Sequence, residues 1–283
     1  MSQIINGVIY SDDFKTVTGL DTSITKEFEL QIRDTVRTIA PNAFRNQKHI
    51  RKITLPKGLK TIGENAFMGC SRLEHCNLPD TISLIDTAAF QGCEMLKKVK
   101  LPDRIEKIEP ETFSGCTRLE TVEFPDYITE IGAYAFADCR LLKNITIPED
   151  VTYIGMSAFR GCACLNVHLP ENIQIIEESA FYNTAISHVI IPNSIILIGD
   201  NAFGKCINLD KVSWFGKFLP TSEKMEKIFS DREDAFYYED FRNPDSFSHI
   251  SEFESVLDNK QTVKMPTSEL EIAQNSVYDN FIK

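Results

Sequence analysis

Cysteine and histidine are the residue types in this chain best suited to redox, nucleophilic or metal chemistry. Six of the eight cysteines share a register, at Cys70, Cys93, Cys116, Cys139, Cys162 and Cys206. If this spacing marks stacked coils, equivalent residues lie ~4.8 Å apart with parallel Cα–Cβ bonds, and their Cβ atoms stay wider apart than the ~3.8 Å that a disulfide prefers. A straight row of thiols also cannot surround a zinc ion tetrahedrally. We therefore expect these residues, with Cys76 and Cys164, to be free thiols that pack as small apolar side chains.

The five histidines do not suggest a metal site either. His168 and His188 fall on adjacent coils of the repeat described below, about 7–8 Å apart by strand geometry, and the pattern places no third ligand beside them. No serine stands in a nucleophile elbow, and there is no glycine-rich phosphate loop. The sequence therefore predicts no enzyme, no cofactor and no metal ion.

Composition narrows the class of protein. The chain has 283 residues, 42% of them hydrophobic, and a net charge of −11. This charge argues against nucleic acid and against an anionic membrane as partners, because both attract basic surfaces. No run approaches the ~18 apolar residues of a spanning helix, so we expect no membrane insertion. The first residues lack the basic and apolar regions of a signal peptide. The prediction is a cytoplasmic protein, or a cell-surface one if a leader has been trimmed.

The elements that position these residues follow from an internal repeat. Phenylalanine recurs in steps of 22 or 23 residues, at Phe44, Phe67, Phe90, Phe113, Phe136, Phe159, Phe181 and Phe203. An isoleucine stands five residues before each of them, and a proline stands eleven residues before all but the first. Periods of 20–50 residues indicate a solenoid or a similar array. The sequence therefore predicts about eight stacked coils.

Each part of the repeat has a structural reason. Before each proline, apolar residues alternate with polar ones, as at Ile53 and Leu55, which is typical of a short strand with one buried face. Proline ends the strand because it has no N–H for the ladder. The position two residues after each Phe is mostly Gly, Asn or Asp, which tolerate the left-handed conformation. We interpret the segment around each Phe as a short helical turn closed by a left-handed cap.

The consensus "LPxxIxxIGxxAFxGCxxL" resembles the BspA-type leucine-rich repeat over residues 28–215, and "INGVIYSDDFKTV" is similar to the family's first-coil hairpin. The resemblance implies a right-handed superhelix of about eight 22–23-residue coils with a parallel β-sheet on one side. It also implies a binding protein and no catalytic activity. The expected organisation is an N-terminal hairpin cap at 1–27, repeats at 28–215 and a helical C-terminal capping segment at 216–283.

The segment after residue 215 is expected to be ordered because it is rich in aromatic residues, unlike most disordered segments. Helix-start signals at Ser222, Asp245 and Thr267 predict two or three short helices. A solenoid needs a cap at its last coil. Apolar residues also gather at outward positions of the last coils, at Ile175, Ile190, Ile196 and Leu197. We expect the tail to cover them, with a second protein chain as the alternative.

The outward positions of the strands form the surface best placed to meet a partner. This row is polar and relatively basic on an acidic molecule, and the candidate partner-binding residues are Lys98, Lys100, Glu123, His168 and His188. A long rigid face of mixed polarity suits a protein ligand, and a glycan is a second possibility. The leading hypothesis is a non-catalytic binding scaffold. The alternatives are a cell-surface adhesin and, without any supporting motif, an enzyme with its site in the C-terminal segment.

Overall fold

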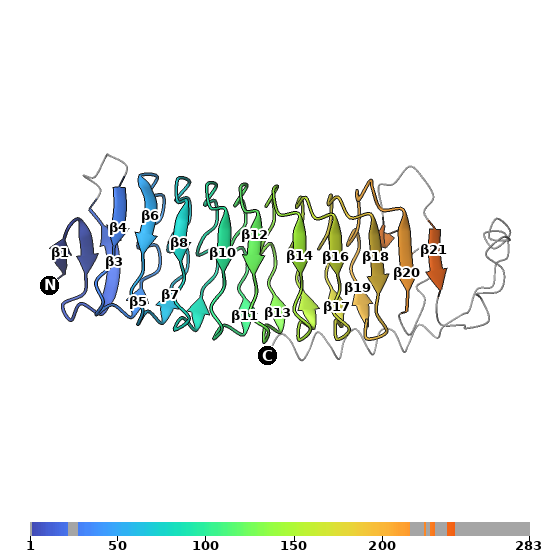
Figure 1. The fold of residues 1–283 in the computed structure, drawn as a ribbon, viewed down its shortest axis with the longest axis horizontal. Coiled ribbons are helices and arrows are strands. Elements are labelled where there is room, and N and C mark those ends of the chain that lie inside the picture. The colour runs from blue at the N-terminus through green and yellow to red at the C-terminus, as the bar shows by residue number, and fades with distance from the viewer. Residues whose placement is uncertain (1, 22–27, 216–223, 225–226, 230–236, 241–283) are drawn as a thin grey trace.

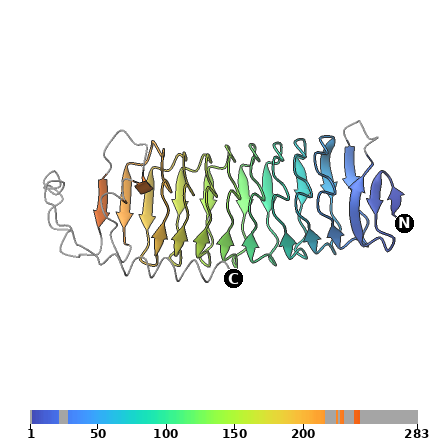
Figure 2. The same ribbon diagram turned by 180° about the vertical axis from the view of Figure 1, so that it is seen from behind.

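The computed structural model describes residues 2–21, 28–215, 224, 227–229 and 237–240. These residues form an elongated β-solenoid whose coils stack in chain order from one end to the other (Figures 1 and 2). The predicted solenoid and its N-terminal hairpin are confirmed. The predicted helical C-terminal cap falls almost wholly outside the described residues. Of the residues after 215 that the structure does describe, Lys224, Lys227 and Ile228 have helical geometry.

The N-terminal end is closed by antiparallel strands. β1 (Gln3–Ile5) pairs with β2 (Val8–Tyr10) through a two-residue turn in which Asn6 and Gly7 have φ angles of 50° and 79°. Positive φ at both central residues matches the right-handed twist of a hairpin. β3 (Thr16–Leu20) is antiparallel to β2 and parallel to β5 (Thr38–Ile39), so it joins the hairpin to the first coil.

One side of the solenoid, the strand face, carries one three- to five-residue strand per coil. Its members are β4 (Phe28–Gln31), β6 (Ile50–Thr54), β8 (His75–Asn77), β10 (Lys98–Lys100), β12 (Thr121–Glu123), β14 (Asn144–Thr146), β16 (Asn166–His168), β18 (His188–Ile191), β20 (Lys211–Trp214) and β21 (Tyr237–Asp240). Hydrogen bonds divide them into four parallel sheets, β4-β6-β8, β10-β12, β14-β16 and β18-β20-β21. The predicted parallel strands are confirmed, but the ladder is segmented rather than continuous.

A second ladder of two-residue strands runs along another side and is here called the back ladder. Its members are β5 (Thr38–Ile39), β7 (Thr61–Ile62), β9 (Leu84–Ile85), β11 (Lys107–Ile108), β13 (Glu130–Ile131), β15 (Tyr153–Ile154), β17 (Ile175–Ile176) and β19 (Leu197–Ile198). Each strand ends on the isoleucine that stands five residues before a Phe. These isoleucines are all at most 5% exposed, so the strand directs one apolar side chain inward per coil.

The arc around each Phe is a series of turns rather than the predicted helical turn. The predicted left-handed residue two positions after each Phe is confirmed, for example at Gly69 with φ 71° after Phe67. A second left-handed residue lies two positions before the same Phe, at Asn65 with φ 55°. Alternate N–H groups therefore point along the solenoid: Phe67 N–H donates to Ala89 O at 2.7 Å in the next coil. A helix would direct these donors within the coil, whereas here they join neighbouring coils.

The core is organised by one column of stacked phenylalanine rings. The eight repeat phenylalanines are at most 1% exposed. Consecutive ring centroids lie 5.1–5.5 Å apart with interplanar angles of 3–12°. This offset stacking adds to the burial of apolar area.

The cysteine row lies beside this column. All eight cysteines are free and buried, as predicted. Each of the six cysteines in register places Sγ 3.0–3.3 Å from the carbonyl oxygen of a Phe in the preceding coil, for example Cys116 with Phe90 O at 3.3 Å. A thiol is a weak donor that is small enough for this space. Cysteine therefore satisfies a buried carbonyl while it packs as an apolar side chain.

The stack continues beyond residue 215, the predicted end of the repeats. Phe229 stacks on Phe203 at 5.5 Å, and β21 pairs in parallel with β20. Phe203 N–H donates to Ile228 O at 3.0 Å, which repeats the bond between earlier coils. The step of 26 residues between the two phenylalanines hid this coil from a search at a period of 22 or 23.

The apolar residues of the last coils have different fates. Trp214 is 1% exposed and Ile175 is 3% exposed, so both belong to the core. The Trp214 Nε1 has no hydrogen-bond partner among the described residues. Ile190 and Ile196 remain 42% and 49% exposed, so the expected cover over these two side chains is not shown. The helix-start positions Ser222, Asp245 and Thr267 lie outside the described residues.

Replacing Phe113 with alanine removes a ring from the middle of the column. We expect the free energy of unfolding to fall by ~3–5 kcal/mol, the usual cost for a buried Phe. Urea unfolding followed by circular dichroism measures it. Tyr127→Ala is the control, because Tyr127 is 70% exposed and its loss should change stability by no more than about 0.5 kcal/mol. Equal losses in the two variants would contradict a column that carries the core.

Deleting residues 216–283 should produce an aggregating protein. The deletion exposes the ring of Phe203, removes the acceptor of its N–H and leaves β20 as an open edge, and open edges template aggregation. The control is deletion of 241–283, which keeps Phe229 and β21. Size-exclusion chromatography of both variants provides the measurement. A soluble monomer from the longer deletion would show that the coil of Phe229 does not protect the end.

Candidate functional site

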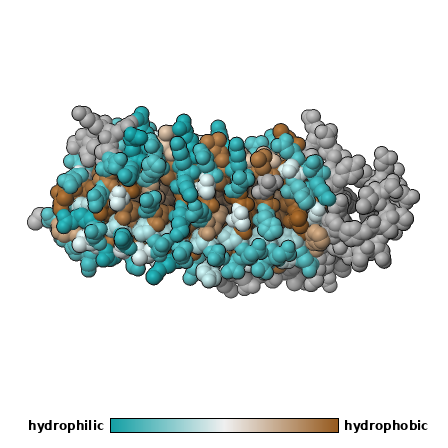
Figure 3. Space-filling view, in the orientation of Figure 1, coloured by the Kyte–Doolittle hydropathy of each residue, from teal (hydrophilic) through white to brown (hydrophobic). Residues whose placement is uncertain are grey.

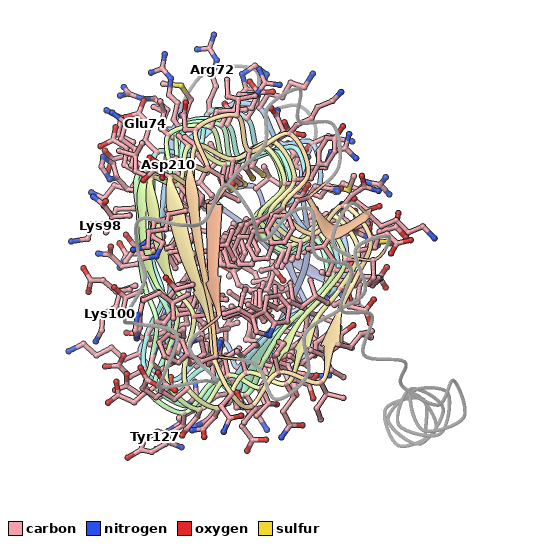
Figure 4. The ribbon with its side chains drawn as sticks, turned by 90° about the vertical axis from the view of Figure 1, so that its right-hand side faces the viewer. Arg72, Glu74, Lys98, Lys100, Tyr127 and Asp210 are labelled. Atoms are coloured by element: carbon pink, nitrogen blue, oxygen red, sulfur yellow. The ribbon has the colours of Figure 1, made fainter. Side chains whose placement is uncertain are left out.

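The candidate site is the row of side chains that points outward from the strand face. Lys98 and Lys100 project from this face into solvent when the molecule is viewed along its axis (Figure 4). Glu123 and His168 are exposed on β12 and β16, and His188 is partly exposed on β18. The space-filling view shows this face as rows of hydrophilic side chains with apolar residues between them (Figure 3).

The two lysines are held by carboxylates on neighbouring coils. Lys98 Nζ lies 2.8 Å from Glu123 Oε1 across the β10–β12 pair, and Lys100 Nζ lies 3.5 Å from Asp80 Oδ1. The hydrogen bond and charge of Lys98 lower the pKa of Glu123 below its usual value. Both ion pairs are solvent-exposed and contribute little to stability. Their effect is to hold the charged ends of Lys98 and Lys100 in fixed positions on the strand face.

The two histidines have different neighbours and do not form a pair. His168 Nε2 lies 3.6 Å from Glu149 Oε1, and His188 Nε2 lies 3.1 Å from Ser213 Oγ. The two strands that carry them, β16 and β18, belong to different sheets. Within the described ranges, no three His, Cys, Asp or Glu side chains come together as metal ligands.

The five predicted residues are too widely spread to surround one small molecule. From β10 to β18 there are four coil steps of ~4.8 Å, which places Lys98 and His188 roughly 19 Å apart along the axis. They can contact one macromolecule together. Ser213 occupies an outward register position on β20, next to Ile190 of β18, but it is only 4% exposed and lies beside His188.

Sequence reasoning missed a charged row at one border of the strand face. The position just before β8, β10, β12 and β14, which in β6 is the second residue of the strand, alternates in sign over five coils, at Arg51, Glu74, Lys97, Glu120 and Lys143. Arg51 donates from both Nε and Nη2 to the carboxylate of Glu74, at 3.2 and 3.1 Å. Hydrogen bonding between them raises the pKa of Arg51 and lowers that of Glu74. The signal was available as a charge at a fixed offset within each repeat.

A second missed row borders the opposite side of the strand face. The residue after each strand-ending proline is acidic in five successive coils and exposed in all of them, at Asp80, Asp103, Asp126, Glu149 and Glu171. In this row, Asp80 Oδ1 lies 3.5 Å from Lys100 Nζ, and Glu149 Oε1 lies 3.6 Å from His168 Nε2. The strand face is therefore a basic to neutral strip bordered on one side by carboxylates.

Comparison with known proteins agrees with this architecture. The model of the BspA type leucine rich repeat region, in six copies, matches residues 22–143 and 129–252. The chain belongs to this family. The second match extends past residue 215, in agreement with the additional coil of Phe229 and β21. None of the curated proteins matches this chain.

Solved leucine-rich repeat proteins share the fold. The structure of one from Bacteroides ovatus aligns with a TM-score of 0.57 at 24% identity, over 76% of this chain and 70% of that one. A leucine rich cell surface protein from Faecalibacterium prausnitzii gives 0.56 at 24% identity, with the same two coverages. A protein from Eubacterium ventriosum gives 0.53 at 24% identity, over 78% of this chain and 52% of that one.

The thiols of this leucine-rich repeat chain are poor nucleophiles. Burial raises the pKa of Cys70 and of Cys116 to about 12. The thiolate is the reactive form of cysteine, and at neutral pH very little of it is present at these positions. The described part of the chain also contains no helix with the length and hydrophobicity of a membrane span.

The back ladder of the repeats is interrupted at one step. Strands β5, β7 and β9 form one sheet and β11 to β19 form another, with no pairing between β9 and β11. Elsewhere the residue after the buried isoleucine donates to the preceding coil, as Gly132 N–H does to Ile108 O at 2.8 Å. Among the described residues, no such bond is recorded for Glu109. A cleft of about 500 Å³ opens there, lined by Arg104, Lys107 and Glu130 among others.

The cause of the interruption is the pair of residues that face each other at this step. A Cβ added to Gly63 or Gly132 would lie 2.7 Å from the backbone nitrogen of a proline in the preceding coil. From residue 63 to residue 199, every closed step of the back ladder has glycine on at least one side. At the open step, Asp86 faces Glu109, so neither side has glycine. Two carboxylate side chains therefore occupy the space in which the backbones of the other coils approach each other.

Replacing Glu109 with glycine should close the back ladder. We expect slower hydrogen exchange at the amide of residue 109, because it gains the carbonyl of Ile85 as acceptor. Glu109→Ala is the matched control: it also removes the carboxylate and its 3.1 Å ion pair with Lys107, but it keeps the Cβ. Native-state exchange read by mass spectrometry measures both. Equal protection in the two variants would show that backbone approach is not the cause.

Proposed function

We propose that this protein is a non-catalytic binding scaffold that engages a protein partner through its strand face, centred on Lys98, Lys100, Glu123, His168 and His188. The observation that supports this function is the regular arrangement of outward side chains on the strand face. Exposed charged and polar side chains stand at fixed intervals along a rigid stack. A solenoid of this kind presents an extended surface to a macromolecular ligand.

Charge favours a protein over other ligands. The basic Lys98 and Lys100 lie beside the acidic row of Asp80, Asp103 and Asp126, and such a mixed pattern suits a partner with complementary charges of both signs. Nucleic acid requires a more basic surface than a chain of net charge −11 offers. A glycan remains the second ligand class, because polar side chains such as Asn144 and Thr146 continue the row.

We further propose that the protein acts in the cytoplasm, where the eight free thiols would stay reduced. The alternative is a surface adhesin. Protease treatment of intact source cells, followed by detection of the protein, distinguishes the two: a cytoplasmic protein survives, whereas a surface protein is degraded.

A photo-crosslinking amino acid at Thr121 tests the strand face in cells. Thr121 is exposed on β12 opposite Lys98, and the control position is Thr129, which is exposed beside the back ladder. We expect a defined protein adduct from position 121 and none from 129, identified by mass spectrometry. Charge reversal at Lys98 and Lys100 should reduce the yield several-fold while thermal unfolding is unchanged. An equal adduct from 129, or a yield insensitive to the reversal, would contradict the proposal.

A further inference from the structure

The corner before each strand is built in one way in most coils. Two residues separate the register cysteine from the leucine that begins the strand side, and the leucine N–H closes a turn onto the cysteine carbonyl. Leu142 N–H donates to Cys139 O at 3.0 Å, and Leu209 N–H donates to Cys206 O at 2.9 Å. The two intervening residues project at the corner. They are Arg140 and Leu141 in the coil before that of Phe159, and Ile207 and Asn208 in the coil after that of Phe181.

Two consecutive coils lack one residue at this corner. Cys162 and Cys164 are separated by Ala163 alone, and Thr184 and Ile186 are separated by Ala185 alone. No turn hydrogen bond of the kind described above is recorded for either coil within the described residues. Cys164 thus takes the place of the strand-side leucine, as its contact with Leu142 O at 3.5 Å shows. These deletions account for both 22-residue steps in the phenylalanine spacing.

The deletions leave a notch about two coils wide. It has a volume of about 280 Å³, and its lining residues include the short-coil residues Gly161, Ala163, Thr184 and Ala185. Two coil steps of ~4.8 Å give an opening of roughly 10 Å along the axis. Arg140 forms one wall, and Ile207 forms the other. The floor consists of small side chains, so the notch can admit a large one.

The rim of the notch is cationic and apolar. Arg140 and Lys205 are both exposed. Asp138 lies 3.6 Å from Arg140 in a solvent-exposed pair, and Lys205 Nζ lies 5.6 Å from the centre of the Tyr182 ring. Among the lining residues Ile207 is 79% exposed, and Leu141 and Leu165, which lie close to Arg140 and Ala163 in the chain, are 41% and 46% exposed. No other large apolar side chain among the described residues is as exposed as Ile207. The rim therefore suits an apolar side chain that is flanked by carboxylates.

We propose that the notch binds the chain's own C-terminal segment, residues 241–283, through Phe253. This phenylalanine stands between Glu252 and Glu254, which matches a floor of small side chains between Arg140 and Lys205. The segment as a whole has 7 acidic and 4 basic residues, a net charge of −3. The notch lies at the corner and not in the outward row of the strand face, so this inference is independent of the proposed function.

The segment is long enough to reach. β21 ends at Asp240, two strand steps from β18 and three coil steps from β16, which is roughly 10–14 Å along the axis. Returning from the end of the strand to its corner adds about 13 Å for four residues at ~3.3 Å each. The thirteen residues from 241 to 253 span up to about 43 Å when extended. Phe253 can therefore enter the notch without displacing β21.

The test places a photo-crosslinking amino acid at position 207 of the full-length chain. We expect an intrachain cross-link to a peptide within 241–283, found by mass spectrometry after proteolysis. The matched control is position 94: Glu94 is the same corner residue in a coil whose neighbours have full-length corners. A mixture of ¹⁴N- and ¹⁵N-labelled chains separates intrachain from interchain products. No cross-link to 241–283, an equal one from position 94, or a solely interchain one would overturn the proposal.

Two variants separate recognition from chance contact. Phe253→Ser removes the proposed side chain, and charge reversal at Arg140 and Lys205 removes the proposed electrostatic match. Each should reduce the intrachain yield at least several-fold. Inserting one residue after Ala163 and one after Ala185 restores the full corner and should also abolish the cross-link, while circular dichroism confirms that the solenoid is intact. A yield unchanged by Phe253→Ser would overturn the assignment of that residue.

Discussion

The stacking distance between neighbouring phenylalanine rings is the constraint on which the remaining structure depends. Each coil advances by about 5 Å along the axis, because the ring centroids lie 5.1–5.5 Å apart and hydrogen bonds join each coil to the next. At this spacing the backbone of one coil rests directly on the next. Every position of the repeat must therefore accept an identical position immediately above and below it, and this requirement selects the residue types.

The residues that recur are those that tolerate this close approach. Glycine after the buried isoleucine leaves room for the preceding backbone, and small or left-handed residues around the Phe turn alternate N–H groups toward the next coil. Cysteine satisfies a phenylalanine carbonyl in a space too small for a longer polar side chain. The thiol row that invites a redox or metal reading is thus a consequence of packing, and its raised pKa values follow from the same burial.

A scaffold of this kind separates stability from recognition. Core positions repeat because they are stacked, whereas outward positions are free to vary, and the charges on them add up to rows rather than to a pocket. The departures from the repeat carry the local chemistry. Asp86 against Glu109 opens the back ladder, and Ala163 with Ala185 opens the corner. A small change in one coil becomes a cleft because its neighbours cannot move to fill it.

The amino-acid pattern by itself determined the family, the coil count up to Phe203, the N-terminal hairpin, the buried Phe and Cys rows and the outward direction of most candidate residues. These features depend on periodicity, which is a property of the chain. Only the tertiary structure revealed the coil of Phe229, since its step of 26 residues breaks the period while its ring still stacks. It also showed that the strand face is segmented, that Ser213 is buried and that the arc around each Phe is not helical. These outcomes depend on what lies against each residue from the coils on either side, and a single repeat does not contain that information.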